Sequence, residues 1–282
     1  MARKILPLAL LSALAAAAFL LAANKRSPSR ESALPLLRTV KEHVQGADRT
    51  VGKLMPLDPE EERRIGAELA KRLRVGPAAP PEESVRRAQD ASRIKEFGQS
   101  FASAPSVKRF RGRYEFSVLY DTRQINAFAI PGGFVFATEG LMRRFAPDGD
   151  AFGFVLAHEI GHVELGHCAD NFRTSAWFRN LGLAPLGAVF ELVRSVAALQ
   201  FSEVQELEAD QFALRLLHER RRNLQAALRA MDLVGVPADE DVRRDPGQIA
   251  VEGLGDFLRT HPGGWERRNR LREQIEKLDR RR

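Results

Sequence analysis

The chain has 282 residues, of which 44% are hydrophobic and 29% charged, and this balance excludes a wholly disordered protein. Its formal net charge is +7, but no nucleic-acid-binding motif accompanies the basic residues, so we expect solvated helical faces and no nucleic-acid partner. The single cysteine, Cys168, excludes an intrachain disulfide and a cysteine-rich zinc module. Any metal site must therefore consist of histidine and carboxylate side chains.

The N-terminus carries the pattern of an export signal. Two cations precede an apolar run over residues 5–23, and polar, basic sequence follows it. The run is also just long enough for a marginal membrane span, so residues 1–24 are interpreted as a signal peptide or an N-terminal membrane anchor. A buried N-terminal helix is the alternative. This pattern predicts an exported protein, either periplasmic or anchored in a membrane and facing the periplasm.

Residues 25–55 are interpreted as a polar linker or helical lead-in, and residues 56–282 as one domain. Asp58 is a predicted N-cap with Pro59 in the first helical position, and the acidic first turn that follows suits the helix dipole. A second helix is expected over residues 82–102, after a proline-rich loop.

Two strands are expected next, one at "YEFSVLYD", where polar and apolar residues alternate, and one at "GGFVFAT", which follows a proline-glycine turn. From "GDAFGFVLAHEIGH" onward the pattern is mainly helical. The sequence therefore predicts an α+β domain that is mostly helical and contains a small sheet.

A metal site is indicated by His158, Glu159 and His162, which form the pattern H-E-x-x-H. Four residues on a helix rotate by about 400°, so both imidazoles project from one face, about one turn apart. They can hold a zinc ion, and Glu159 can reach a water in the open position of the metal. A purely structural role is the alternative, but polar groups in so apolar a segment need a partner.

A third protein ligand is needed. His167 is near, but five residues beyond His162 on a continuing helix it would be rotated by about 140°, so we reject it as a ligand. It is expected to contact a ligand from outside or to lie on the polar surface. Glu206 and Asp210 share one helical face and suit a metal ligand and an acceptor that orients a ligand histidine. A solvated acidic face is the alternative.

The chain resembles the gluzincin metallopeptidase family that contains the HtpX heat-shock protease, the type I CAAX prenyl protease and the OMA-type and periplasmic quality-control proteases. Five blocks carry the resemblance, in order from about residue 56 to the C-terminus: "LDPEEERRIGAEL", "INAFAIPGGFVFATEGLM", "LAHEIGHVELGH", "SEVQELEAD" and "THPGGWERRNRL". The resemblance implies a zincin-like metalloprotease domain whose small sheet has an edge strand beside the active-site cleft. The compact, exported subgroup fits best.

The resemblance also implies roles for single residues. One zinc ion per chain would be held by His158, His162 and Glu206, with Glu159 as the general base and Asp210 orienting a ligand. The family often has Ser-Arg before the helix of the third ligand, whereas this chain has Ser-Glu, which leaves the role of that arginine unfilled.

Two further positions, Asn126 and His261, match family residues implicated in stabilising the tetrahedral intermediate. Spacing alone favours a turn-capping asparagine and a histidine that precedes a helix. The family's edge strand, which pairs with extended substrate, is matched by Gly133, Phe134, Val135 and Phe136. Residues 181–200 are interpreted as an amphipathic cover over the cleft, with a membrane-embedded segment as the alternative.

The function implied is a zinc-dependent metalloendopeptidase in envelope protein quality control, with unfolded or misassembled envelope proteins as substrates. Residues 5–23 could also associate the protein with a membrane. Two alternatives stay open. One is a protease-fold chaperone or binding protein with little or no catalysis, and the other is a zinc hydrolase that acts on cell-wall peptide cross-links.

Overall fold

The computed structural model describes residues 57–74, 81–172, 201–236, 257, 260–261 and 264–280. The chain divides into two compact units, Met1–Met55 and Pro56–Arg282, and all the described residues belong to the second. The predicted signal or anchor, the polar lead-in and the predicted cover at 181–200 lie outside the described residues. Within the described ranges, no helix has the length and apolar character needed to cross a membrane.

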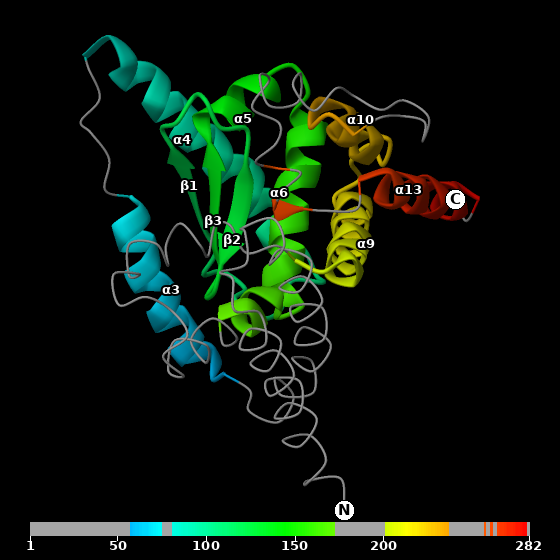
Figure 1. Cartoon of the computed structure of the whole chain (residues 1–282), viewed down its shortest axis with the longest axis horizontal. Coiled ribbons are helices and arrows are strands. Elements are labelled where there is room, and N and C mark those ends of the chain that lie inside the picture. The colour runs from blue at the N-terminus through cyan, green and yellow to red at the C-terminus, as the bar shows by residue number, and fades with distance from the viewer. Residues whose placement is uncertain are drawn as a thin grey trace, which may run out of the picture. The chain divides into compact units, whose positions relative to one another are not determined.

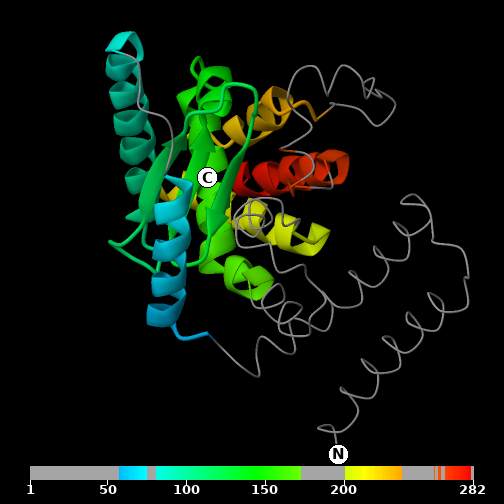
Figure 2. The same ribbon diagram turned by 60° about the vertical axis from the view of Figure 1, so that its left-hand side comes forward.

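The described elements confirm a mostly helical α+β domain with a small sheet (Figures 1 and 2). In chain order they are α3 (Pro59–Leu73), α4 (Pro81–Ala102), β1 (Glu115–Leu119), β2 (Ala127–Ile130), β3 (Phe134–Thr138), α5 (Glu139–Arg144), α6 (Gly149–Glu164), α9 (Glu203–Glu219), α10 (Ala226–Leu233) and α13 (Gly264–Asp279).

The first two predicted helices are confirmed as α3 and α4. The carboxylate of Asp58 caps α3 by accepting the backbone N–H groups of Glu60 and Glu61 at 3.2 and 3.3 Å. Helix α3 lies close to the turn before β3, because a Cβ on Gly66 would come within 1.8 Å of the Pro131 carbonyl oxygen. Only glycine permits this approach, so the sequence of α3 fixes its distance from the sheet.

The sheet has the order β1-β3-β2, with β1 parallel and β2 antiparallel to β3. Strand β2 was not predicted, because all four of its residues are buried and its sequence shows no polar alternation. The prediction that Gly133–Phe136 form the substrate-pairing edge is wrong: β3, which begins at Phe134, is the central strand, and both its edges are already hydrogen-bonded. Among the described strands, β1 and β2 are the outer ones.

Helix α6 lies at the centre of the domain. It packs against β2 and α4 and also against α9 and α10 (Figures 1 and 2). Every residue from Ala151 to Val163 is buried, which explains why the helix is apolar on all sides apart from its histidines and Glu159. Helices α6 and α9 come close at Gly161, where an added Cβ would lie 3.1 Å from the carbonyl oxygen of Ala209 on α9.

Candidate metal centre and active site

Helix α6 carries His158, Glu159 and His162, all with at most 1% of their surface exposed. Asp148 caps the helix by accepting the N–H of Ala151 at 3.0 Å. The helix ends at Glu164, two residues after the second histidine. As predicted, one turn separates the two imidazoles, and their Nε2 atoms lie 3.0 Å apart.

Helix α9 brings the acidic pair to these histidines. Ser202 and Gln205 form a capping box at its start, which fixes the first turn next to Glu206. Glu206 and Asp210 are 0% and 2% exposed, so the alternative of a solvated acidic face is wrong for them. The close approach of α6 and α9 at Gly161 sets how far both carboxylates reach toward the histidines.

Four buried side chains converge at this crossing. The Nε2 atom of His158 lies 3.4 Å from Glu206 Oε2, and that of His162 lies 3.3 Å from Glu206 Oε1. His261, just before α13, joins them with its Nδ1 3.1 Å from Glu206 Oε1. One ligand atom from each of the four residues lies within 4.8 Å of all the others.

The donor set fits a zinc ion. Zinc bonds of about 2.0–2.1 Å in tetrahedral geometry place neighbouring ligand atoms about 3.3 Å apart. The Nε2 atoms of His158 and His162 lie 3.0 Å apart, and they lie 3.4 and 3.3 Å from the two different oxygens of Glu206, which is close to this value. The cluster therefore contains the three predicted ligands, His158, His162 and Glu206, together with His261, and their assignment as the residues that would hold the metal stays a prediction.

Asp210 takes the position expected of a residue that orients a ligand. Its Oδ1 lies 2.8 Å from Nδ1 of His158, on the opposite side of the ring from the metal-facing nitrogen, although the angle is poor for a hydrogen bond. The contact favours a proton on Nδ1 and so leaves the lone pair on Nε2. Burial opposes the charged imidazole, but Asp210 and Glu206 raise the pKa of His158 to about 9.

Sequence reasoning missed Arg267 on α13. Its guanidinium, 3% exposed, donates two hydrogen bonds of 2.8 Å to Asp210 and lies 2.6 Å from Oε2 of Glu206. Burial would raise the pKa of Glu206, but Arg267, His261 and the ligand histidines hold it well below its usual value. The signal available in the sequence was indirect: two buried carboxylates one helical turn apart require a cation.

Glu159 is placed for proton transfer. Both of its carboxylate oxygens are buried, and neither makes a hydrogen bond of good geometry within the described residues, although the backbone N–H of Ala129 and, at 3.4 Å, Nε2 of His261 interact with the carboxylate. Burial raises the pKa of Glu159, whereas His261 and His158 lower it by less. A buried carboxylate without a well-formed hydrogen bond leaves room for a polar partner, as a general base that binds a water requires.

The two positions assigned by resemblance lie at or next to this cluster. His261 Nε2 is 3.4 Å from Glu159 Oε1 and 3.4 Å from the carbonyl oxygen of Ala127 on β2. Asn126 is buried, and its Oδ1 accepts from Thr260, the neighbour of His261 in the chain, at 3.3 Å. Their role toward an oxyanion stays a prediction.

His167 is not a ligand, but the predicted reason was incomplete. Helix α6 does not continue to it: the chain turns at Gly166, which has φ +79°, and His167 follows that turn. His167 is 4% exposed, which excludes a place on the polar surface. Its Nδ1 lies 3.0 Å from Nδ1 of His162, on the side of that ring away from Glu206 and His158.

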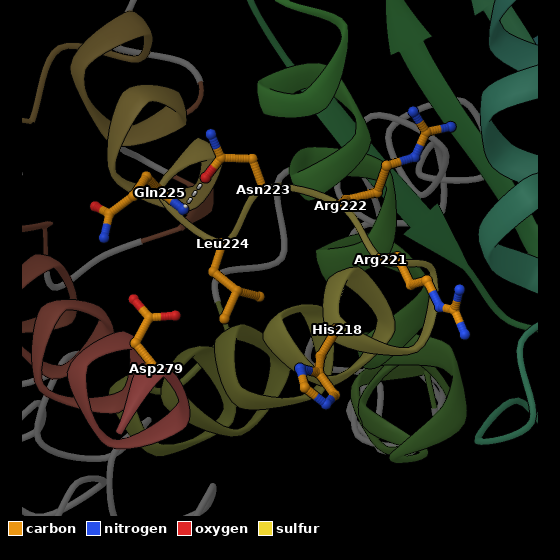
Figure 3. A pocket seen from close by; sticks show the side chains of 7 residues that line it. All are labelled: His218, Arg221, Arg222, Asn223, Leu224, Gln225 and Asp279. Carbon is orange, nitrogen blue, oxygen red and sulfur yellow. Dashed lines mark hydrogen bonds between the residues drawn. The ribbon is translucent and has the colours of Figure 1, made fainter. Parts of the chain in front are cut away.

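A cavity of about 680 Å³ lies where α9 turns into α10 and faces the end of α13 (Figure 3). Its lining includes His218, Arg221, Asn223 and Asp279. None of its lining residues belongs to the buried cluster, and none is a buried carboxylate or histidine. This cavity therefore lacks the donor set of a metal site, and the buried donor set lies at the α6–α9 crossing.

Comparison with known proteins shows which family the chain resembles. The profile described as Peptidase family M48 matches residues 88–275, which include the four clustered residues. The chain is 30% identical over 160 residues to the mitochondrial metalloendopeptidase OMA1 of Arabidopsis thaliana, in an alignment covering 55% of this chain but 30% of that protein. The chain is 27% identical to the metalloprotease YcaL of Escherichia coli (strain K12), in an alignment covering 66% of this chain and 73% of YcaL. It is 28% identical to the metalloprotease LoiP of the same organism, over 36% of this chain and 44% of LoiP.

Proposed function

The chain belongs to peptidase family M48, and on that premise we propose that it is a zinc-dependent endopeptidase that degrades unfolded or misassembled envelope proteins. The observation that carries the proposal is the convergence of His158, His162 and Glu206 beside the buried carboxylate of Glu159. A bound zinc ion would polarise the scissile carbonyl and lower the pKa of a bound water toward about 7.

The chain's own residues supply the proton transfers. Glu159 accepts the proton of the attacking water and returns it to the departing amine, because its raised pKa brings the carboxyl closer to neutral pH. His261 Nε2 lies 3.4 Å from Oε1 of Glu159, and this distance supports the proposal that His261 donates to the developing oxyanion. Asn126 would support it through Thr260 or donate directly.

Extended substrate would pair with β2, not with β3. All four residues of β2 lie opposite residues of β3, and the Asn126 carbonyl accepts from the Thr138 N–H. Hydrogen-bonded pairs alternate along an antiparallel ladder, so Phe128 and Ile130 are the residues of β2 that bond to β3. In a strand, alternate residues point their N–H and C=O groups to opposite edges, so Ala127 and Ala129 present theirs to the outer edge. The Ala127 carbonyl indeed faces His261.

Both alanines are buried in this structure, so a substrate would replace the contacts that now cover them. Recognition through backbone groups, beside the small side chains of two alanines, fits a protease with loose side-chain specificity. This is the property that degradation of many different unfolded proteins requires.

The test is a comparison of the purified full chain with Glu159→Gln, assayed for bound zinc and for casein cleavage with and without a chelator. We expect one zinc per chain in both proteins, and cleavage that falls by about 10²–10⁴ in the variant. Glu203→Gln, an exposed change on α9, serves as the matched control and should cleave normally. Undiminished cleavage by Glu159→Gln would contradict the role of Glu159 as the general base. Zinc binding without cleavage by the wild type would favour the binding-protein alternative.

We also propose that the protein acts outside the cytoplasm, in the periplasm or anchored to a membrane facing it. The support is the pair of cations followed by the apolar run over residues 5–23. A reporter enzyme that is active only outside the cytoplasm, fused to the C-terminus, should be active with the full chain and inactive when residues 1–24 are deleted. Equal reporter activity in both fusions would contradict the proposal.

A further inference from the structure

We propose that His167 and Glu208 act as a positioning pair that fixes the tautomer and the ring orientation of the ligand His162. The inference rests on the proposed function, since it concerns how one metal ligand is held. It adds two residues to the site, one of them on the turn after α6 and the other on α9.

The three side chains form a continuous line. Nδ1 of His162 lies 3.0 Å from Nδ1 of His167, and Nε2 of His167 lies 3.2 Å from Oε2 of Glu208. His162 and His167 are 0% and 4% exposed, so bulk water does not compete for the contact between them. The positive φ of Gly166 makes the line possible, because it turns the chain so that His167 folds back toward His162.

With both imidazoles neutral, one arrangement of protons satisfies every contact in this line. A carboxylate only accepts hydrogen bonds, so Glu208 requires a proton on Nε2 of His167. A neutral His167 then has a bare Nδ1, which must accept a hydrogen bond from Nδ1 of His162. The ring of His162 is thereby left with its lone pair on Nε2, the atom that lies 3.3 Å from Glu206.

The reverse arrangement fails on two counts. A proton donated from His167 to His162 would put the remaining proton of His162 on Nε2, where it would block metal binding. It would also leave a bare nitrogen of His167 facing the carboxylate of Glu208, and two acceptors at 3.2 Å repel each other. With both rings neutral, the line therefore has one polarity, and that polarity leaves Nε2 of His162 free for a metal.

The plane of the His162 ring is held separately. Phe201 stacks on it with ring centroids 3.6 Å apart and planes inclined by 15°. Stacking limits tilting, whereas the contact with His167 limits rotation of the ring about the bond to its backbone. The other ligand, His158, has a carboxylate directly at its Nδ1, so the two ligands are oriented by different groups.

The experiment compares His167→Leu with His167→Asn in the full chain. Leucine fills the space without an acceptor, whereas the Oδ1 of asparagine can take the place of Nδ1 and accept from His162. Zinc affinity is measured by competition with a chromophoric chelator. We expect the leucine variant to bind zinc about 10–100-fold more weakly and the asparagine variant to recover most of the affinity.

A second readout follows the proton itself. In protein loaded with Co²⁺, the ring N–H protons of ligand histidines give shifted NMR signals, whose rate of exchange with water reports how well each N–H is held. The His162 signal should exchange slowly in wild type and His167→Asn and be broadened or lost in His167→Leu. The His158 signal, held by Asp210, should stay unchanged and is the internal control.

His218→Leu on α9, where the histidine is exposed, controls for loss of a histidine elsewhere, and circular dichroism in chelator checks that each variant is folded. A leucine variant with wild-type zinc affinity, or an asparagine variant as weak as the leucine variant, would overturn the inference alone. A wild-type protein that binds no zinc would overturn the proposed function, and the inference with it.

Discussion

Replacing Arg267 with methionine tests whether this guanidinium holds the metal centre together. The side chain donates to both oxygens of Asp210, lies 2.6 Å from Glu206 and also donates to the carbonyl of His261 at 3.3 Å. Methionine has a comparable length but no charge. The substitution leaves two carboxylates with 0% and 2% exposure without their cation.

Removing one partner of a buried ion pair costs about 3–5 kcal/mol, because the remaining charge stays buried without compensation. For a domain of this size, that loss corresponds to a melting temperature lower by about 6–20 °C. The upper end applies in chelator, since a bound zinc ion would partly replace the missing charge beside Glu206. The difference between Arg267→Met and wild type should therefore shrink when zinc is added.

Thermal unfolding followed by circular dichroism, in chelator and in excess zinc, measures both effects. Arg270→Met is the matched control on the same helix, because Arg270 is 56% exposed and its pair with Glu273 spans 3.6 Å. It should change the free energy of unfolding by less than about 0.5 kcal/mol. The reasoning is refuted if Arg267→Met melts in chelator at the same temperature as Arg270→Met.

Three further outcomes are expected. Chelator should lower the melting temperature of wild type but not that of Glu206→Ala, because zinc at 100 times its dissociation constant stabilises the folded state by about 2.7 kcal/mol. An equal shift of the melting temperature in both proteins would contradict the ligand assignment. The Arg229 hydrogen bond holds the pKa of Asp148 below its usual value, so the pair stabilises the folded state above about pH 4, and this stabilisation is lost as the pH falls. Asp148→Asn keeps the cap and should lower the free energy of unfolding by less than about 1 kcal/mol at pH 7, measured in urea, and by nothing near pH 2. A stability difference between the variant and wild type that grows on acidification would contradict this assignment. Gly66→Ala should cost about 1–3 kcal/mol because its Cβ would meet the Pro131 oxygen at 1.8 Å, and an unchanged urea midpoint would show that α3 does not brace the turn.

The parts of the fold that depend on neighbouring residues were predicted well. Asp58 and Pro59 mark the start of α3 through a cap and a fixed φ, which are properties of a few consecutive residues. The spacing of His158 and His162, and that of Glu206 and Asp210, is likewise a local property of one helix. These pairs meet in the structure as the helical period requires.

The parts that depend on distant contacts were not predicted. Whether β3 is central or at an edge depends on β2, whose sequence AFAI has no alternation to reveal it. Arg267 is 57 residues from Asp210, so no local pattern connects them. It supplies a cation beside the acidic pair, whereas Ser202-Glu203 before α9 contains no arginine. His167 was judged on a continuing helix, whereas the turn at Gly166 brings it back to His162.

If substrate pairs with the outer edge of β2 as proposed, this has a consequence for how a client protein would be chosen. Pairing with Ala127 and Ala129 needs a stretch of client backbone whose own hydrogen bonds are broken. If the client opens and closes faster than it is cut, the rate of cleavage follows the fraction of time that the stretch is open. Each additional 1.4 kcal/mol of local client stability would then slow cleavage about tenfold, so the protease would rank its clients by their free energy of opening rather than by their sequence.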